Sequence, residues 1–153
     1  MVLFIGEFNV KHMTLTCRII ESGQERSEPS KVILQGLIDY NKPWFGHLQS
    51  FCINLQDDSD QVVAGINGVI DVGRREILVW QVWVNETYRG QGIGRQLMDK
   101  LEEFSKSKDC HLILLDTFEF QALAFYKKLG YQCYATVPKQ MAGHDKYFLR
   151  KEV

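Results

Sequence analysis

The chain has 153 residues, of which 45% are hydrophobic and 24% charged, which suffices for one compact domain with a sizeable core. Its formal net charge of −1 and the lack of a basic tract argue against nucleic acid or an anionic membrane surface as a partner. No apolar stretch approaches the roughly 20 residues needed to cross a bilayer. We therefore expect a single soluble, cytoplasmic domain over residues 1–153.

The four cysteines are widely spaced, with no Cys-x-x-Cys pair and no cluster of histidines nearby. Neither a zinc site nor a redox motif is expected, so the sequence predicts no metal. Free thiols of this kind fit a reducing cytosol.

The amino-terminal part is predicted to hold one strand and one helix. Residues 1–12 lack the basic region and cleavage site of a signal peptide, and they could be a vector-derived extension if Met13 is the natural start. Residues 14–20 alternate like a strand, and residues 21–30 form a polar connection. An apolar stripe then predicts a helix over about residues 30–39. The loop that follows it is aromatic.

The rest of the chain alternates strands and helices. Residues 47–55 and 61–71 read as antiparallel strands, and residues 76–84 as a third strand. Residues 111–117 are apolar on both faces, which is typical of a strand in a parallel pair. Helices are expected over about residues 94–107 and 121–129, and two last antiparallel strands over residues 131–138 and 144–151.

The junction between the third of these strands and the next helix is the most informative segment. It reads Arg89-Gly90-Gln91-Gly92-Ile93-Gly94, and an amphipathic helix follows. Glycines allow close approach to the backbone and a helix N-terminus offers unpaired N–H groups, so this junction predicts an anion site. A dinucleotide fingerprint fails because Arg95 or Leu97 stands where its last glycine belongs, and no nucleoside-triphosphate P-loop string occurs.

Two motifs together resemble the GNAT superfamily of N-acetyltransferases. They are Arg89-x-x-Gly92-x-Gly94 and, in the later helix, Ala122-x-x-Phe125-Tyr126-x-x-x-Gly130-Tyr131. The resemblance implies an α/β fold whose central mixed, mostly antiparallel sheet has helices on both faces. It also implies acetyl-coenzyme A (acetyl-CoA) as acyl donor, and a homodimer is common among relatives.

The resemblance implies where the coenzyme binds. Backbone N–H groups of residues 91–96 would hold the pyrophosphate, with charge from Arg89 and Arg95, and the strand before the loop would pair with the pantetheine arm. The backbone N–H of Val84 would stabilise the oxyanion. The full set of expected coenzyme-binding residues is Val82, Trp83, Val84, Arg89, Gly90, Gln91, Gly92, Ile93, Gly94, Arg95, Gln96, Glu119 and Tyr126.

Catalytic and acceptor residues are assigned in the same way. Tyr126 matches the tyrosine that many relatives use as general acid toward the coenzyme thiolate. Glu119 stands where relatives often carry Asn, so it is expected to cap the helix that follows or to face the amine. Candidates for the general base are Glu76, Asp116 and His144, and those for acceptor contacts are Tyr40, Trp44, Phe45, Trp80 and Gln81.

The sequence therefore predicts an N-acetyltransferase that moves the acetyl group of acetyl-CoA to a primary amine. Direct transfer in a ternary complex is expected because no cysteine lies in a recognisable nucleophile motif. A small-molecule acceptor is favoured over a protein N-terminus or lysine. The alternative from a different class is a non-catalytic acyl-CoA sensor or interaction module.

Overall fold

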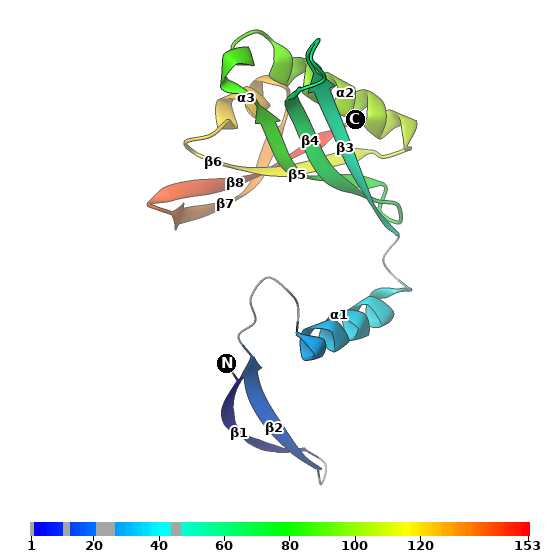
Figure 1. The fold of residues 1–153 in the computed structure, drawn as a ribbon, viewed down its shortest axis with the longest axis vertical. Helices are drawn as coiled ribbons and strands as arrows, with labels where there is room; N and C mark the ends of the chain where they lie inside the picture. Colours follow the sequence, from blue (N-terminus) through cyan, green and yellow to red (C-terminus); the bar gives the residue numbers. More distant parts are fainter. Residues whose placement is uncertain (1, 11–12, 21–26, 44–46) are drawn as a thin grey trace. The chain divides into compact units, whose positions relative to one another are not determined.

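The computed structural model describes residues 2–10, 13–20, 27–43 and 47–153, and the chain divides into two compact units, Met1–Pro43 and Trp44–Val153 (Figure 1). Each unit is defined by itself. The prediction of a single domain stays a prediction.

The first unit contains a β-hairpin and a helix. Strand β1 (Val2–Val10) pairs antiparallel with β2 (Met13–Ile20), and helix α1 spans Glu28–Asn41. Strand β1 is not among the strands that the sequence predicts, since no strand is predicted before residue 14. Helix α1 confirms the helix predicted from residue 30, and it begins earlier because Pro29 suits the first turn of a helix.

The second unit is built on a six-stranded mixed sheet in the order β3-β4-β5-β6-β8-β7. Every neighbouring pair is antiparallel except β5 and β6, which run parallel, as the apolar run at residues 111–117 predicted. The strands are β3 (Leu48–Gln56), β4 (Val62–Asp71), β5 (Glu76–Val84), β6 (Leu112–Phe118), β7 (Gln132–Met141) and β8 (His144–Glu152).

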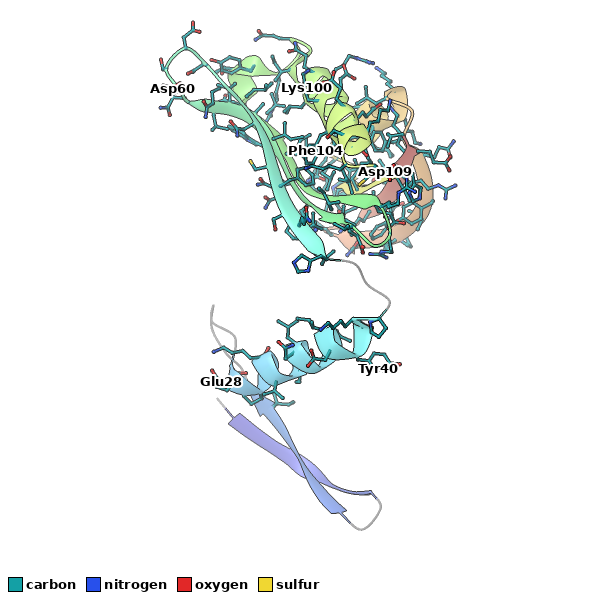
Figure 2. The ribbon with its side chains drawn as sticks, turned by 90° about the vertical axis from the view of Figure 1, so that its right-hand side faces the viewer. Glu28, Tyr40, Asp60, Lys100, Phe104 and Asp109 are labelled. Carbon is teal, nitrogen blue, oxygen red and sulfur yellow. The ribbon has the colours of Figure 1, made fainter. Side chains whose placement is uncertain are left out.

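Helices α2 (Ile93–Ser107) and α3 (Leu123–Lys128) pack on one face of this sheet and share its core. Leu97 and Leu101 of α2 are fully buried, and Phe104 meets Phe51 of β3 with ring centroids 5.1 Å apart. Figure 2 shows Phe104 on this side of the helix. The predicted helix on the opposite face stays a prediction, since α1 belongs to the other unit.

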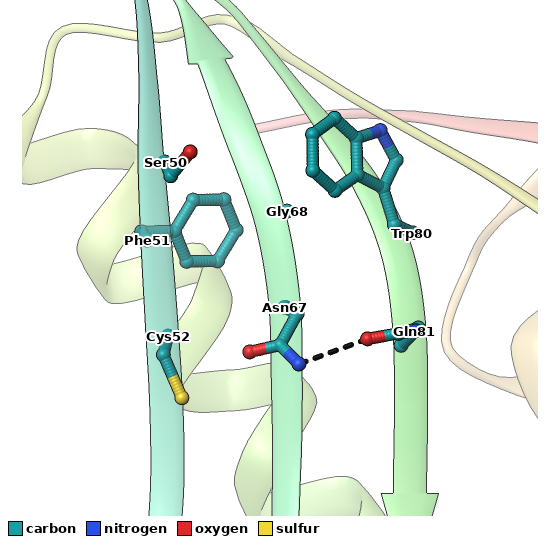
Figure 3. A pocket seen from close by; sticks show the side chains of 7 residues that line it. All are labelled: Ser50, Phe51, Cys52, Asn67, Gly68, Trp80 and Gln81. Atoms are coloured by element: carbon teal, nitrogen blue, oxygen red, sulfur yellow. Dashed lines mark hydrogen bonds between the residues drawn. The ribbon is translucent and has the colours of Figure 1, made fainter. Parts of the chain in front are cut away.

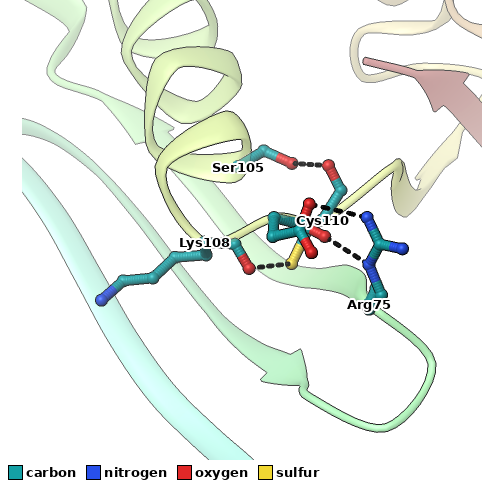
Figure 4. Close-up of polar contacts among 5 residues, drawn as sticks. Arg75, Ser105, Lys108 and Cys110 are labelled. Carbon is teal, nitrogen blue, oxygen red and sulfur yellow. Dashed lines mark hydrogen bonds and ion pairs between the residues drawn. The ribbon is translucent and has the colours of Figure 1, made fainter.

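The turn after α2 is tied to the hairpin between β4 and β5. Arg75 donates from Nε to Asp109 O and from Nη2 to Asp109 Oδ1, both at 2.7 Å (Figure 4). The Ser105 hydroxyl, buried at the end of α2, donates to Cys110 O at 3.5 Å. These contacts fix where α2 ends and β6 begins.

A bulge in β5 changes how this strand meets β6. Asn67 of β4 is opposite Gln81 while Gly68 is opposite Val79, so Trp80 is the extra residue. A side chain on Gly68 would lie 2.4 Å from the Leu78 carbonyl oxygen, so only glycine fits beside the bulge. The parallel pairing of β5 with β6 stops at Leu78, in keeping with the bending that a bulge produces.

Candidate active site

Beyond Leu78, β5 has no partner strand on its β6 side within the described residues, and two of its backbone amides point to this free edge. Asn85 N–H donates across to Val63 O at 2.9 Å, so this residue faces β4. Because N–H directions alternate along a strand, the N–H groups of Val82 and Val84 point to the other edge. That edge borders the gap where β5 and β6 have parted.

The loop after β5 presents a run of unpaired amides. The short 3₁₀ helix η1 (Glu86–Tyr88) is capped by Asn85, and Gly90 and Gly92 take φ values of 76° and 83°. Among the described residues, no hydrogen-bond acceptor faces the N–H groups of residues 90–95. Helix α2 begins within this run, so its positive end faces the same space.

Two expectations about this loop need correction. The amide of Gln96 donates to Gly92 O at 3.1 Å, so it is part of the helix and not of the free run. The Arg89 side chain turns back instead of reaching outward. Its Nε donates to Val84 O at 3.0 Å, and Nη1 lies 3.5 Å from the carboxylate of Glu86. Of the two arginines expected to supply charge, Arg95 makes no such side-chain contact with any residue that the structure describes.

Helix α3 closes against the loop. A Cβ on Gly94 would lie 3.2 Å from the Phe125 ring, so the glycine allows α3 to approach the start of α2. Sequence reasoning missed Phe125 as part of the site, although it precedes Tyr126 in the family motif. Because Phe125 packs against the loop at Gly94, this contact also helps to fix the position of the next residue, Tyr126.

Tyr126 is buried in the core beside the site. It is 6% exposed, and its ring meets that of Tyr131 edge-on at 5.8 Å. Burial, with a further contribution from the charge of Asp116, raises the pKa of the Tyr126 phenol to about 12. The phenol is therefore protonated across the neutral range, as a proton donor must be.

Glu119 does not cap α3, which corrects the expected role. The start of this helix shows no side-chain cap. The turn before it is held by Gln121, whose Oε1 accepts from Phe118 N at 2.9 Å, and by Thr117, whose hydroxyl accepts from Ala122 N at 3.3 Å. The Glu119 carboxylate lies 3.6 Å from His144 Nδ1 instead.

The three candidates for the general base stand in different places. Glu76 begins β5, at the opposite end of the strand from Val84, and pairs with Arg74 at 3.5 Å. At about 3.3 Å per strand residue, that separation is roughly 25 Å, which removes Glu76 from the site. Asp116 is paired with Lys146 at 2.8 Å, and His144 with Glu119.

The expected acceptor residues divide between the two units. Trp80 and Gln81 line a shallow cavity of about 470 Å³ over β3, β4 and β5, where Asn67 donates to Gln81 Oε1 at 2.9 Å (Figure 3). Tyr40 belongs to α1 in the first unit. Trp44 and Phe45 lie outside the described residues.

Comparison with known proteins agrees with this geometry. Residues 19–131 match the profile of the acetyltransferase (GNAT) family, and the chain belongs to that family. It is therefore an acyltransferase, and the family uses acetyl-CoA. A crystal structure of an acetyltransferase from Bacillus cereus superimposes with a TM-score of 0.77 at 28% identity, covering 87% of this chain and 98% of that one.

Three curated relatives are acetyltransferases. One from Agrobacterium fabrum is 28% identical over 82% of this chain and 91% of its own length. A glucosamine 6-phosphate N-acetyltransferase of Trypanosoma brucei is 40% identical over 40% of this chain, and a blasticidin-S acetyltransferase of Streptomyces morookaense is 32% identical over 47%. The matches to the last two span 42% and 54% of their lengths.

No group of three or more His, Cys, Asp or Glu side chains is arranged to hold a metal ion in the part of the chain that the structure describes. No described helix combines the length and apolar character required to span a bilayer.

Proposed function

We propose that this protein transfers the acetyl group of acetyl-CoA directly to a primary amine in a ternary complex. The observation that carries the proposal is the run of unpaired amides at residues 90–95 beside the free edge of β5. Unpaired amides at a helix N-terminus suit a pyrophosphate, and a free strand edge suits the amide groups of a pantetheine arm.

The acyl group would lie at the end of β5. With the pantetheine arm along the free edge, the N–H of Val84 is available to the thioester carbonyl. Negative charge develops on that oxygen during attack, and a fixed amide stabilises it without reorganisation. Tyr126 then supplies a proton to the departing thiolate, and its raised pKa keeps the phenol protonated at neutral pH.

A small molecule is the favoured acceptor. Two of the relatives carry names that specify a small-molecule substrate, glucosamine 6-phosphate or blasticidin S. We place the reaction in the cytoplasm, since Cys52, Cys110 and Cys133 are free thiols.

Release of coenzyme thiol tests the proposal. The wild type is incubated with acetyl-CoA and a panel of amines that includes glucosamine 6-phosphate and blasticidin S, and free thiol is monitored. We expect amine-dependent release by at least one member. Tyr126→Phe should lower kcat about 10- to 100-fold with little change in the Kd for acetyl-CoA.

Tyr134→Phe is the matched control, because this tyrosine is 53% exposed on β7. Loss of kcat in both variants alike would contradict the role of Tyr126. Tight coenzyme binding without thiol release for any amine would favour the sensor instead.

A further inference from the structure

We propose that His144 is the general base that takes the proton of the acceptor amine, with Glu119 as the residue that positions its imidazole. This assignment rests on the proposed acetyl transfer. It supplies a group that removes the proton of the amine, a step for which the coenzyme-binding residues provide none. An amine in neutral water is mostly an ammonium ion, so a group beside the thioester must accept a proton before the nitrogen can attack.

The imidazole of His144 is held on two sides. Its Nδ1 lies 3.6 Å from Glu119 Oε2, and its ring meets Phe120 edge-on with centroids 5.0 Å apart. Phe120 in turn stacks on Phe118 at 5.5 Å. A carboxylate beside Nδ1 favours the tautomer that carries its proton there. That arrangement leaves Nε2 as the proton acceptor, and His144 is 45% exposed, so solvent-borne molecules can reach it.

The backbone around the pair is fixed as well. Glu119 N–H donates to Asp145 O at 2.9 Å, which joins the end of β6 to the start of β8. The carboxylate of Asp145 accepts from Lys139 N at 3.0 Å and is therefore engaged in the β7–β8 hairpin. Glu119 is thus the carboxylate that faces the imidazole.

The pair lies at the same end of the sheet as the proposed acyl site. Parallel strands place their carboxyl ends at one edge, and β5 and β6 are the parallel pair. From the last paired rung, Leu78 with Leu114, the strands reach Val84 and Glu119 after equal numbers of residues once the bulged Trp80 is set aside. Glu119 therefore follows the carboxyl end of β6, at the same end of this strand pair as the amide proposed to hold the oxyanion.

A second carboxylate on this face, that of Asp116, has a lysine as its partner. Asp116 lies 2.8 Å from Lys146 Nζ, and that ammonium also lies 5.5 Å from the centre of the Phe118 ring and 5.3 Å from that of Phe148. The Asp116 carboxylate therefore already has a cationic partner on this face. With Glu76 at the far end of β5, His144 is the remaining candidate.

The ammonium gives one proton to His144 Nε2, and its nitrogen lone pair forms the C–N bond while the carbonyl oxygen takes up negative charge. The carbonyl re-forms, the C–S bond breaks, and the thiolate receives the proton of Tyr126. The nitrogen then loses its second proton, which returns to Tyr126 through water, and His144 releases its proton to solvent.

The test is the pH profile of kcat/KM with whichever amine of the panel supports thiol release, at saturating acetyl-CoA. For His144→Gln we expect a loss of roughly 100-fold or more at neutral pH. The ascending limb that an imidazole produces between about pH 5 and 8 should disappear. Added imidazole should restore part of the rate. Glu119→Gln should keep an ascending limb and lower kcat/KM, because the imidazole loses the carboxylate that positions it.

Two matched substitutions serve as controls. His111→Gln makes the same change at the opposite end of β6, and Glu103→Gln removes an exposed carboxylate that pairs with Lys100 on α2. Both should retain the wild-type profile. An unchanged ascending limb in His144→Gln would overturn the dyad while leaving the acetyltransferase proposal standing. No amine-dependent thiol release by the wild type would overturn both.

Discussion

Arg89 Nε donates a hydrogen bond of 3.0 Å to the carbonyl oxygen of Val84. The bond closes the loop onto the end of the strand that precedes it. The carbonyl and the amide of one strand residue point to the same edge, so the bond also fixes the residue whose N–H is proposed to hold the oxyanion. The first residue of the family motif thus serves the geometry of β5.

Arg89→Ala should weaken acetyl-CoA binding about tenfold. A hydrogen bond from a charged donor contributes about 1.5–3 kcal/mol, and solvent at this half-exposed side chain reduces that value. Isothermal titration calorimetry with acetyl-CoA measures the change. Glu86→Gln is the control, because it removes the carboxylate 3.5 Å from Arg89 and keeps the bond to Val84. Equal losses in the two variants would mean that the hydrogen bond to Val84 is not the cause of the weaker binding.

Gly92→Ala should destabilise the protein and weaken coenzyme binding. Gly92 has φ of 83°, and a left-handed conformation costs an L-residue roughly 1–2 kcal/mol. Space is not the cause, since a Cβ there would meet no atom within 4 Å. Urea unfolding should therefore show a loss of about 1 kcal/mol.

Gly36→Ala is the contrasting variant. Gly36 also has open space around its Cβ position, but it lies inside α1, where alanine is favoured by about 0.5–1 kcal/mol. An unchanged or raised stability is expected. If Gly92→Ala were as well tolerated as Gly36→Ala, the loop would not require its left-handed turn.

The parts of the fold that follow local patterns were predictable, and those that depend on strand geometry were not. The alternation in residues 47–84 and the apolar run at residues 111–117 predicted the sheet and its parallel pair, which the structure confirms. The residues around Trp80 contain no local pattern that predicts a bulge. The bulge depends on the close approach of Gly68 on β4 to Leu78 on β5, which lie on different strands. The role of this edge of β5 could therefore be predicted only from the resemblance to the GNAT superfamily.

The site shows the same division. Residues 91–96 were expected to present their amides because glycines precede a helix, which is a local signal, and within the described residues the expectation is wrong for Gln96, whose amide donates to Gly92 O. Glu119 was expected to cap α3 because it precedes that helix, but Gln121 and Thr117 hold the turn before it. Its actual partner, His144, is distant in sequence, and only the pairing of β6 with β8 brings the two together.

Alkaline pH should destabilise the protein through its buried phenols. Burial raises the pKa of Tyr126 from 10.0 to about 12 and raises that of Tyr131 as well. Between these values the folded protein keeps protons that the unfolded chain has lost. The free energy of unfolding should therefore hold up to about pH 10 and decrease as the pH rises toward 12.

Urea unfolding at pH 8, 10 and 11 measures this dependence. Tyr126→Phe removes one of the phenols, so its stability should fall less steeply above pH 10 than that of the wild type. Tyr134→Phe should follow the wild type, because Tyr134 is exposed. Parallel curves for all three proteins would mean that Tyr126 ionises at its ordinary pH in the folded state.

Thr117→Val should lower both stability and kcat. Thr117 is 2% exposed, and its hydroxyl accepts from Ala122 N at 3.3 Å where the chain enters α3. Valine keeps the shape and leaves that N–H without its partner, at a cost of about 1–3 kcal/mol. Because Tyr126 follows on the same short helix and its N–H donates to Ala122 O, a shift at Ala122 should move the phenol and reduce kcat. Urea unfolding and thiol release measure the two effects, with Thr136→Val on exposed β7 as the neutral control. A variant that lost stability but kept full kcat would show that α3 holds Tyr126 in place without this bond.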